Sequence, residues 1–143
     1  MNTPRVLLLV ALASAPVIAE ADPNCPDAVT AAAKKAFPDA TVTKCIAETA
    51  GFEVTMQRKD KSIVELDISA KGEIEQIEEV VSLAAIPAVV SKAFAAKYPK
   101  AAMLRAEKQT KADKTVSYEI AFESRKDLKE ATFKDDGTFV EED

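Results

Sequence analysis

The stretch that decides the fold is Ile86–Pro99, IPAVVSKAFAAKYP, because an earlier stretch, Cys25–Pro38, CPDAVTAAAKKAFP, repeats its pattern. A shift of 61 residues aligns the opening prolines, and places Phe-Pro at the end of one stretch on Tyr-Pro at the end of the other. Each stretch predicts a helix, because proline is tolerated at a first helical position and a second proline ends the helix. In the later copy a stripe of mostly apolar residues recurs at helical spacing. Its members are Ile86, Val89, Val90, Ala93, Phe94, Lys97 and Tyr98.

The match between the two stretches continues into segments that alternate apolar and polar residues. After a short insertion near Lys111 to Lys114, Phe52-Glu53-Val54 aligns with Tyr118-Glu119-Ile120, and Gly72 aligns with Gly137. Alternation with period two predicts strands with one buried face and one wet face, as in an antiparallel sheet. Lys71-Gly72 and Asp135-Asp136-Gly137 predict tight hairpin turns. The segments around 40–49 and 101–110, which precede these strands, are less clearly patterned.

The repeat predicts an α+β fold made of two tandem α-β-β-β-β repeats, each a helix packed on an antiparallel sheet. The first repeat is expected at residues 22–80 and the second at residues 81–143. A period near 60 residues is too long for a solenoid array, and two copies are too few. Whether the two sheets join edge to edge stays open at this point.

Residues 1–21 have the pattern of an export signal. Arg5 supplies a positive charge, Val6–Ala15 form an apolar run, and small residues follow at positions that suit cleavage after Ala21 or Ala19. The apolar run is too short for the roughly 20 residues of a spanning helix, so no membrane insertion is expected after cleavage. The sequence therefore predicts a periplasmic or secreted protein.

Cys25 and Cys45 are the two cysteines of the chain, and both follow the predicted signal. In an oxidising compartment one disulfide is expected, with two buried free thiols as the alternative. The helix of the first repeat would carry Cys25 at its start, and the first strand would carry Cys45. A bridge there would pin the helix to the sheet. Its role would be structural, because the sequence has no C-x-x-C motif.

The composition excludes most catalytic chemistry. The chain has no histidine and three glycines, which removes the commonest general base and the glycine-rich loops that cradle phosphate. A net charge of −5 disfavours nucleic acid and anionic membranes as partners. No catalytic residue, metal ligand or cofactor is predicted, and the protein is not expected to be an enzyme. A hydrolase built on paired carboxylates is the remaining enzymatic alternative.

The wet side of the predicted sheet is the candidate binding face. Acidic residues recur there at matching positions of the two repeats, with basic residues close by in sequence. The functional interpretation is an acidic platform that docks a basic protein surface or peptide. The plain alternative is a solvated sheet face with weak cross-strand ion pairs, and a second functional hypothesis is a small-ligand or cation-binding protein. The acids are Glu53, Glu65, Asp67, Glu119 and Glu130, and the nearby bases are Arg58, Lys59, Lys61, Arg125, Lys126 and Lys129.

The chain resembles the PepSY-like family of exported bacterial proteins. The resemblance rests on a helix that ends in Phe/Tyr-Pro-x-Ala, on RAEKQTKADKTVSYEIAF at residues 105–122, and on the closing FKDDGTFVEED at residues 133–143. That family is similar in fold to the β-lactamase inhibitor protein, a tandem repeat of a helix-on-sheet unit. The resemblance implies a periplasmic or secreted, non-enzymatic module that binds or inhibits a peptidase or another envelope enzyme. It brings no catalytic or metal residues.

Overall fold

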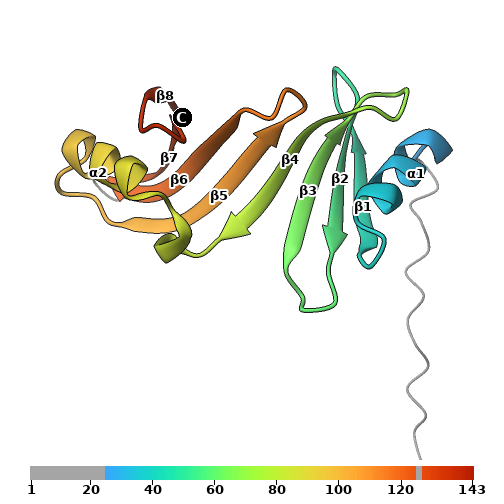
Figure 1. Ribbon diagram of the computed structural model, residues 1–143, viewed down its shortest axis with the longest axis horizontal. Helices are drawn as coiled ribbons and strands as arrows, with labels where there is room; N and C mark the ends of the chain where they lie inside the picture. The colour runs from blue at the N-terminus through green and yellow to red at the C-terminus, as the bar shows by residue number, and fades with distance from the viewer. Residues whose placement is uncertain (1–24, 125–126) are drawn as a thin grey trace, which may run out of the picture.

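The structure, a computed structural model, describes residues 25–124 and 127–143. The predicted export signal, residues 1–21, lies outside the described residues. Within them, two α-helices and a short 3-10 helix accompany one antiparallel sheet of 8 strands (Figure 1). The α+β class predicted from the sequence is therefore confirmed. No helix in the described part of the chain is long and apolar enough to cross a membrane.

The strands pair strictly in sequence order, so the sheet is a meander in which each strand lies beside its neighbours along the chain. Each half of the chain contributes a helix followed by strands. The first half consists of α1 (Asp27–Ala36), β1 (Thr41–Ala47), β2 (Phe52–Gln57), β3 (Ile63–Ile68) and β4 (Ile74–Val81). The second consists of η1 (Leu83–Ala85), α2 (Ala88–Lys97), β5 (Met103–Lys111), β6 (Val116–Ser124), β7 (Asp127–Lys134) and β8 (Phe139–Glu142).

The helix boundaries differ by one position from the prediction. Pro26 and Pro87 precede the helices as their N-caps, with extended ψ angles of 145° and 140°, and do not occupy the first helical position. Their carbonyl oxygens accept the first helical hydrogen bonds, from the amides of Thr30 and Ser91. Phe37 and Tyr98 leave the helical conformation because each precedes a proline, as predicted.

Two hydrophobic cores lie on the same face of the sheet. The first gathers under α1 around Val29, and the second under α2 around Phe94. Ile77 and Val81 point to one side of β4, yet Ile77 packs against the first core and Val81 against the second. Both helices therefore cover the same face, at opposite ends of the molecule (Figure 1).

The predicted stripe of α2 is narrower in the structure than in the sequence pattern. Val90 and Phe94 are buried, but Val89 is 47% exposed, so its place on the buried stripe was wrong. This helix has 10 residues and only Val90 and Phe94 among them are buried against the sheet, so Val89 lies to the side of the contact.

The two halves share one continuous sheet, which answers the question that the sequence left open. The joint is the antiparallel pairing of β4 with β5, which runs from Gln76 opposite Lys111 to Val81 opposite Ala106. Because this pairing leaves no gap between the halves, the face opposite the helices extends without interruption across all the strands. We call it the open face.

The strand registers of the halves coincide under the sequence match. Phe52 pairs with Ile68 as Tyr118 pairs with Phe133. The first pair of strands in each half has a register shift at equivalent positions, between Val42 and Lys44 and between Met103 and Arg105. The last pair also has one, just before Ile68 and just before Phe133.

The two predicted glycine turns contact the helices in the same way. Gly72 and Gly137 have φ angles of 84° and 87°, which favour glycine. A Cβ on Gly72 would lie 2.8 Å from the carbonyl oxygen of Ala28, and one on Gly137 would lie 3.0 Å from that of Val89. Each turn therefore closes against the second residue of its helix.

A disulfide joins Cys25 to Cys45 with a Cα–Cα distance of 5.7 Å. It ties the chain just before α1 to the buried face of β1, where Cys45 lies opposite Val54. Both sulfur-bearing residues belong to or pack against the first core.

Candidate binding face

The predicted acidic residues all lie on the open face. In β2 and β3, Val54 and Leu66 point into the core, so the alternating neighbours Glu53, Glu65 and Asp67 point away from it. In β6 and β7 the buried Ile120 and Ala131 fix Glu119 and Glu130 on the same open side. The sequence pattern therefore placed these residues on a common surface, although their binding role remains a prediction.

Two further carboxylates, Glu78 and Glu107, join this surface at the centre of the sheet. Glu78 lies opposite Glu65, and Glu107 lies opposite Glu119. Sequence reasoning missed both. The alternation of Arg105, Glu107 and Gln109 could have revealed Glu107, but Glu78 sits in a Glu-Glu doublet that gives no phase until β4 is paired. We call the complete set the acidic face: Glu53, Glu65, Asp67, Glu78, Glu107, Glu119 and Glu130.

The register places like charges directly opposite one another. Glu53 faces Asp67, Glu65 faces Glu78, and Glu107 faces Glu119. Cross-strand neighbours of the same charge destabilise a sheet, because their Cβ atoms lie only about 4.5–5.5 Å apart. The folded protein therefore maintains a concentration of negative charge that its own stability does not require.

Side-chain amides and a hydroxyl connect the central carboxylates. The Nε2 atom of Gln109 donates to Oε2 of Glu119 at 3.2 Å and to Oε1 of Glu78 at 3.4 Å, while the hydroxyl of Ser117 donates to Oε1 of Gln109 at 3.0 Å. Gln76 donates to the same oxygen of Glu78 at 2.5 Å. These bonds fix the carboxylates in place without neutralising them.

Burial and mutual repulsion raise the pKa values of this group. Burial, followed by the charges of Glu130, Glu107 and Glu78, raises the pKa of Glu119 to about 7. Burial is also the largest cause of the raised pKa values of Glu78 and Glu107. In the first half, burial and the neighbouring acids raise the pKa values of Glu53 and Asp67. Glu119 therefore titrates near neutral pH.

Few cations compensate the acidic face. Among the described residues, Glu107 is its one member with an ion pair, to Arg105, which is half exposed. The bases expected nearby pair elsewhere: Arg58 with Glu79 on the helix side, Lys59 with Asp39, and Lys129 with Glu142. Lys129 lies opposite the core residue Phe122 and so faces the helix side, whereas Lys59 and Lys61 lie in the turn between β2 and β3. Arg125 and Lys126 lie outside the described residues.

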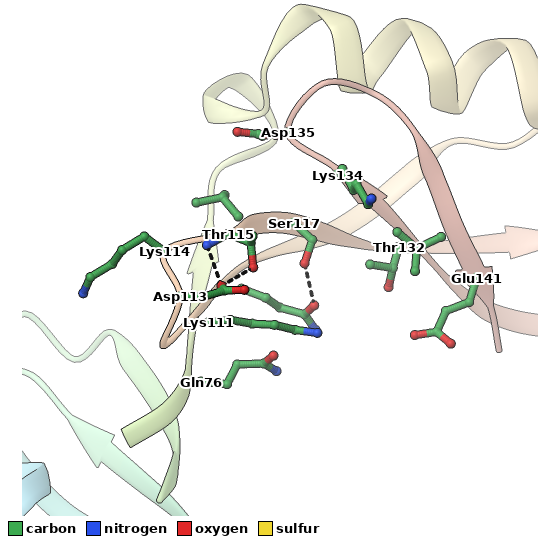
Figure 2. Close-up of a pocket in the computed structure, with 13 residues that line it drawn as sticks. Gln76, Lys111, Asp113, Lys114, Thr115, Ser117, Thr132, Lys134, Asp135 and Glu141 are labelled. Atoms are coloured by element: carbon green, nitrogen blue, oxygen red, sulfur yellow. Dashed lines mark hydrogen bonds between the residues drawn. The ribbon is translucent and has the colours of Figure 1, made fainter. Parts of the chain in front are cut away.

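A hollow of about 700 Å³ adjoins the acidic face at its β5–β8 end (Figure 2). Its lining is mostly polar and includes Gln109, Ser117 and Thr132. Figure 2 shows Ser117 and Thr132 with Lys111, Lys134 and Glu141 around them. No group of three or more acidic or cysteine side chains in the described part of the chain is arranged to hold a metal ion. The cation-binding hypothesis therefore has no preformed site among these residues.

Comparisons with known proteins agree with this architecture. The model of a family described as "Putative beta-lactamase-inhibitor-like, PepSY-like" matches residues 60–141, which run from the turn between β2 and β3 into β8. No curated protein matches the chain in sequence.

Several solved structures are similar in fold at low sequence identity. A Bacteroides eggerthii protein described as periplasmic has a TM-score of 0.74 and 17% identity, over 83% of this chain and 88% of that one. A DUF2874 family protein from Bacteroides uniformis has a TM-score of 0.73 and 15% identity, over 82% and 88%. A BLIP-like protein from Bacteroides fragilis has a TM-score of 0.67 and 19% identity, over 82% and 84%. With the fold shared and the family model matching more than half of its length, this chain belongs to the β-lactamase-inhibitor-like, PepSY-like family.

Proposed function

We propose that the protein is a non-enzymatic binding module of the bacterial envelope, periplasmic or secreted, whose open face docks a basic surface of a protein partner. The partner would be an envelope peptidase or another envelope enzyme, which the module inhibits or regulates by surface complementarity. The observation that carries this proposal is the acidic face: carboxylates held opposite one another, with one ion pair among the described residues.

The continuous sheet supports a docking role. No helix within residues 25–124 and 127–143 covers the open face, so the acids of both halves are presented on one surface. An excess of negative charge, as on the acidic face, attracts a basic partner at a distance and selects against acidic proteins. The repulsion that the acids impose on each other would be relieved when a partner brings lysine or arginine to them.

We also propose that the two halves arose by duplication of one α-β-β-β-β unit, with residues 22–80 and 81–143 as the copies. The coincident registers, the matching register shifts and the glycine contacts to Ala28 and Val89 support this. Such a duplication doubles the area of open face that one chain offers.

The experiment is capture of a partner from an envelope extract with the mature protein, followed by an inhibition assay on the captured enzyme. A triple variant, Glu65→Gln, Asp67→Asn and Glu119→Gln, should capture at least tenfold less, because each lost charge pair weakens the complex. The matched control is Asp27→Asn, Glu73→Gln and Asp127→Asn, which removes the same charge from exposed positions elsewhere. Binding should weaken as salt is raised. Equal capture by both triple variants would refute the proposal.

A further inference from the structure

The charge of the open face changes sign along strands β5 to β7. Next to the β5–β6 turn lies Lys111, and Lys134 faces Ser117 across the β6–β7 pairing. Two residues further along the strands, the row that contains Glu119 and Thr132 begins, with Glu141 beside Thr132 on β8. Among the residues that line the hollow, Lys111 and Lys134 therefore mark a cationic end and Glu141 marks an anionic end, with polar groups between them. Glu119 lies opposite Thr132 on the open face, beside the anionic end.

Thr132 lies at the boundary between the two ends, and its hydroxyl bonds to no residue that the structure describes. The residue is only 7% exposed, and its hydroxyl makes no hydrogen bond to another described residue. No sealed side-chain oxygen or nitrogen in the described ranges lacks a partner, so this hydroxyl reaches the hollow. Figure 2 shows it between Ser117 and Glu141, with its oxygen on the side of the hollow. The residue is mostly buried, but its hydroxyl opens into the hollow, where it can donate one hydrogen bond to a ligand and accept another.

The cationic end is also available. Neither Lys111 nor Lys134 forms an ion pair with another described residue, and both line the hollow (Figure 2). Asp113, which lies near them at the rim, accepts hydrogen bonds at 2.9 and 2.5 Å from the amide and hydroxyl of Thr115. These bonds hold the Asp113 carboxylate at the turn, where it keeps its charge. The three lysines Lys111, Lys114 and Lys134 outnumber the two aspartates Asp113 and Asp135, so this end of the hollow keeps a net positive charge.

We propose that the hollow binds the C-terminal residue of a peptide or protein that ends in lysine or arginine. The chain carboxylate would lie against Lys111 and Lys134, and the side-chain cation would reach Glu119 and Glu141 beside the Thr132 hydroxyl. Two residues along a strand span about 7 Å, which suits the reach of a lysine or arginine side chain from its own carboxylate. This inference rests on the proposed function, because it names the part of a basic partner that one region of the open face would hold.

The test compares three acetylated peptides by calorimetry at pH 8, where Glu119 is ionised: Ala-Ala-Ala-Arg with a free carboxylate, its C-terminal amide, and Ala-Ala-Ala-Gln with a free carboxylate. The free arginine peptide should bind about tenfold more tightly than either of the others, since each lacks one charged hydrogen-bonding group. Equal affinity for the acid and the amide would overturn the inference.

Two variants assign the ends of the hollow. Thr132→Val, which keeps the shape of the side chain, should weaken binding of the free arginine peptide about five- to tenfold. The matched Thr110→Val on the helix side should not change the affinity for this peptide. Lys134→Gln should weaken binding of the free-acid peptide and leave binding of the amide peptide unchanged. This readout does not depend on whether Thr132→Val folds. If Lys134→Gln affects the acid and the amide alike, the carboxylate assignment is wrong.

The two proposals can fail separately. If the acid and amide peptides bind equally, and both bind more weakly to the Glu65, Asp67 and Glu119 triple variant, the C-terminal inference is overturned. The acidic docking face then still stands. If no peptide binds and the triple variant captures partners as well as its control does, both proposals fall.

Discussion

The two halves of the molecule share their element order and strand register, but they fill their cores in different ways. Under α1 the buried residues are mostly aliphatic and small, and a disulfide ties the helix to β1. Under α2 there is no disulfide; instead Phe94 packs against Tyr98, Phe122 and Phe133 at ring-centroid distances of 5.2, 5.3 and 6.2 Å. The difference is visible at equivalent positions of the two halves: Phe94 aligns with Ala33, and Cys45 aligns with Ala106.

The two halves therefore stabilise a small helix-on-sheet unit in two different ways. A single ten-residue helix on a few strands buries too little apolar surface to fold stably by itself. The second half adds surface through rings that bury a large area. The first half restricts the unfolded chain through a covalent bond instead. Each of the following substitutions removes or measures one part of that difference.

The largest expected effect is that of Phe94→Ala, which gives the second half the side chain found in the first. Phe94 is 2% exposed, so the change should lower the free energy of unfolding by about 3–5 kcal/mol through lost burial and a cavity. Guanidinium denaturation followed by circular dichroism measures it, with Val89→Ala as the control on the exposed side of α2. An unchanged midpoint would mean that the helix presents another face to the sheet.

Cys45→Ala makes the reverse exchange by giving the first half the alanine of the second. Loss of a bridge between residues 20 positions apart should cost roughly 3 kcal/mol under oxidising conditions. The double variant Cys25→Ala, Cys45→Ala should match it, and a reductant should destabilise the wild type but not the double variant. Intact-mass spectrometry that finds two alkylatable thiols in the native wild-type protein would contradict the bridge.

Substitution of the two turn glycines tests the same contact between turn and helix in both halves. Gly72→Ala and Gly137→Ala should each cost about 1–3 kcal/mol, because alanine strains a positive φ and its Cβ meets helix backbone. Gly72→Ala should be the more severe, since its contact with the Ala28 oxygen is 2.8 Å, below any tolerated Cβ distance. Thermal unfolding of the two variants side by side gives the order. A harmless Gly72→Ala would show that α1 can move away from the turn.

The smallest expected effect concerns pH and the open face. Since the pKa of Glu119 is raised to about 7 in the folded protein, the native state holds its proton more tightly than the unfolded chain does. The stabilisation is thus present at low pH and is lost as pH rises from the unfolded value near 4.5 through about 7.

Glu119→Gln should therefore raise stability at pH 8, on the order of 1 kcal/mol after allowance for solvent screening, and have little effect at pH 4. Denaturation midpoints of the variant and the wild type between pH 4 and pH 8 measure the difference. The charges that face Glu119 are Glu78 on β4, Glu107 on β5 and Glu130 on β7, and Glu73→Gln at an exposed turn is the control. A parallel pH profile for Glu119→Gln and wild type would place the neutral titration elsewhere.

Much of the candidate face could be predicted from the sequence, because period-two alternation assigns side chains to faces wherever one face is clearly apolar. Val54, Leu66 and Ile120 gave that phase for the predicted acids. The pattern failed in β4 and β5, where few residues are buried and the phase is weak. Glu78 and Glu107 were missed for that reason, and closeness in sequence did not reveal that Arg58 and Lys129 face the helix side.

The sequence by itself determined the local elements, since proline placement, helical spacing, strand alternation and glycine turns act over a few residues. The pairing of β4 with β5 was decided only in three dimensions, because either strand could have remained an edge and local patterns do not distinguish the two outcomes. That pairing joins two small sheets into one open face and sets Glu78 opposite Gln109, whose amide donates to both Glu78 and Glu119. The hollow around Thr132 likewise depends on how the far strands curl, and curvature is a property of the assembled sheet.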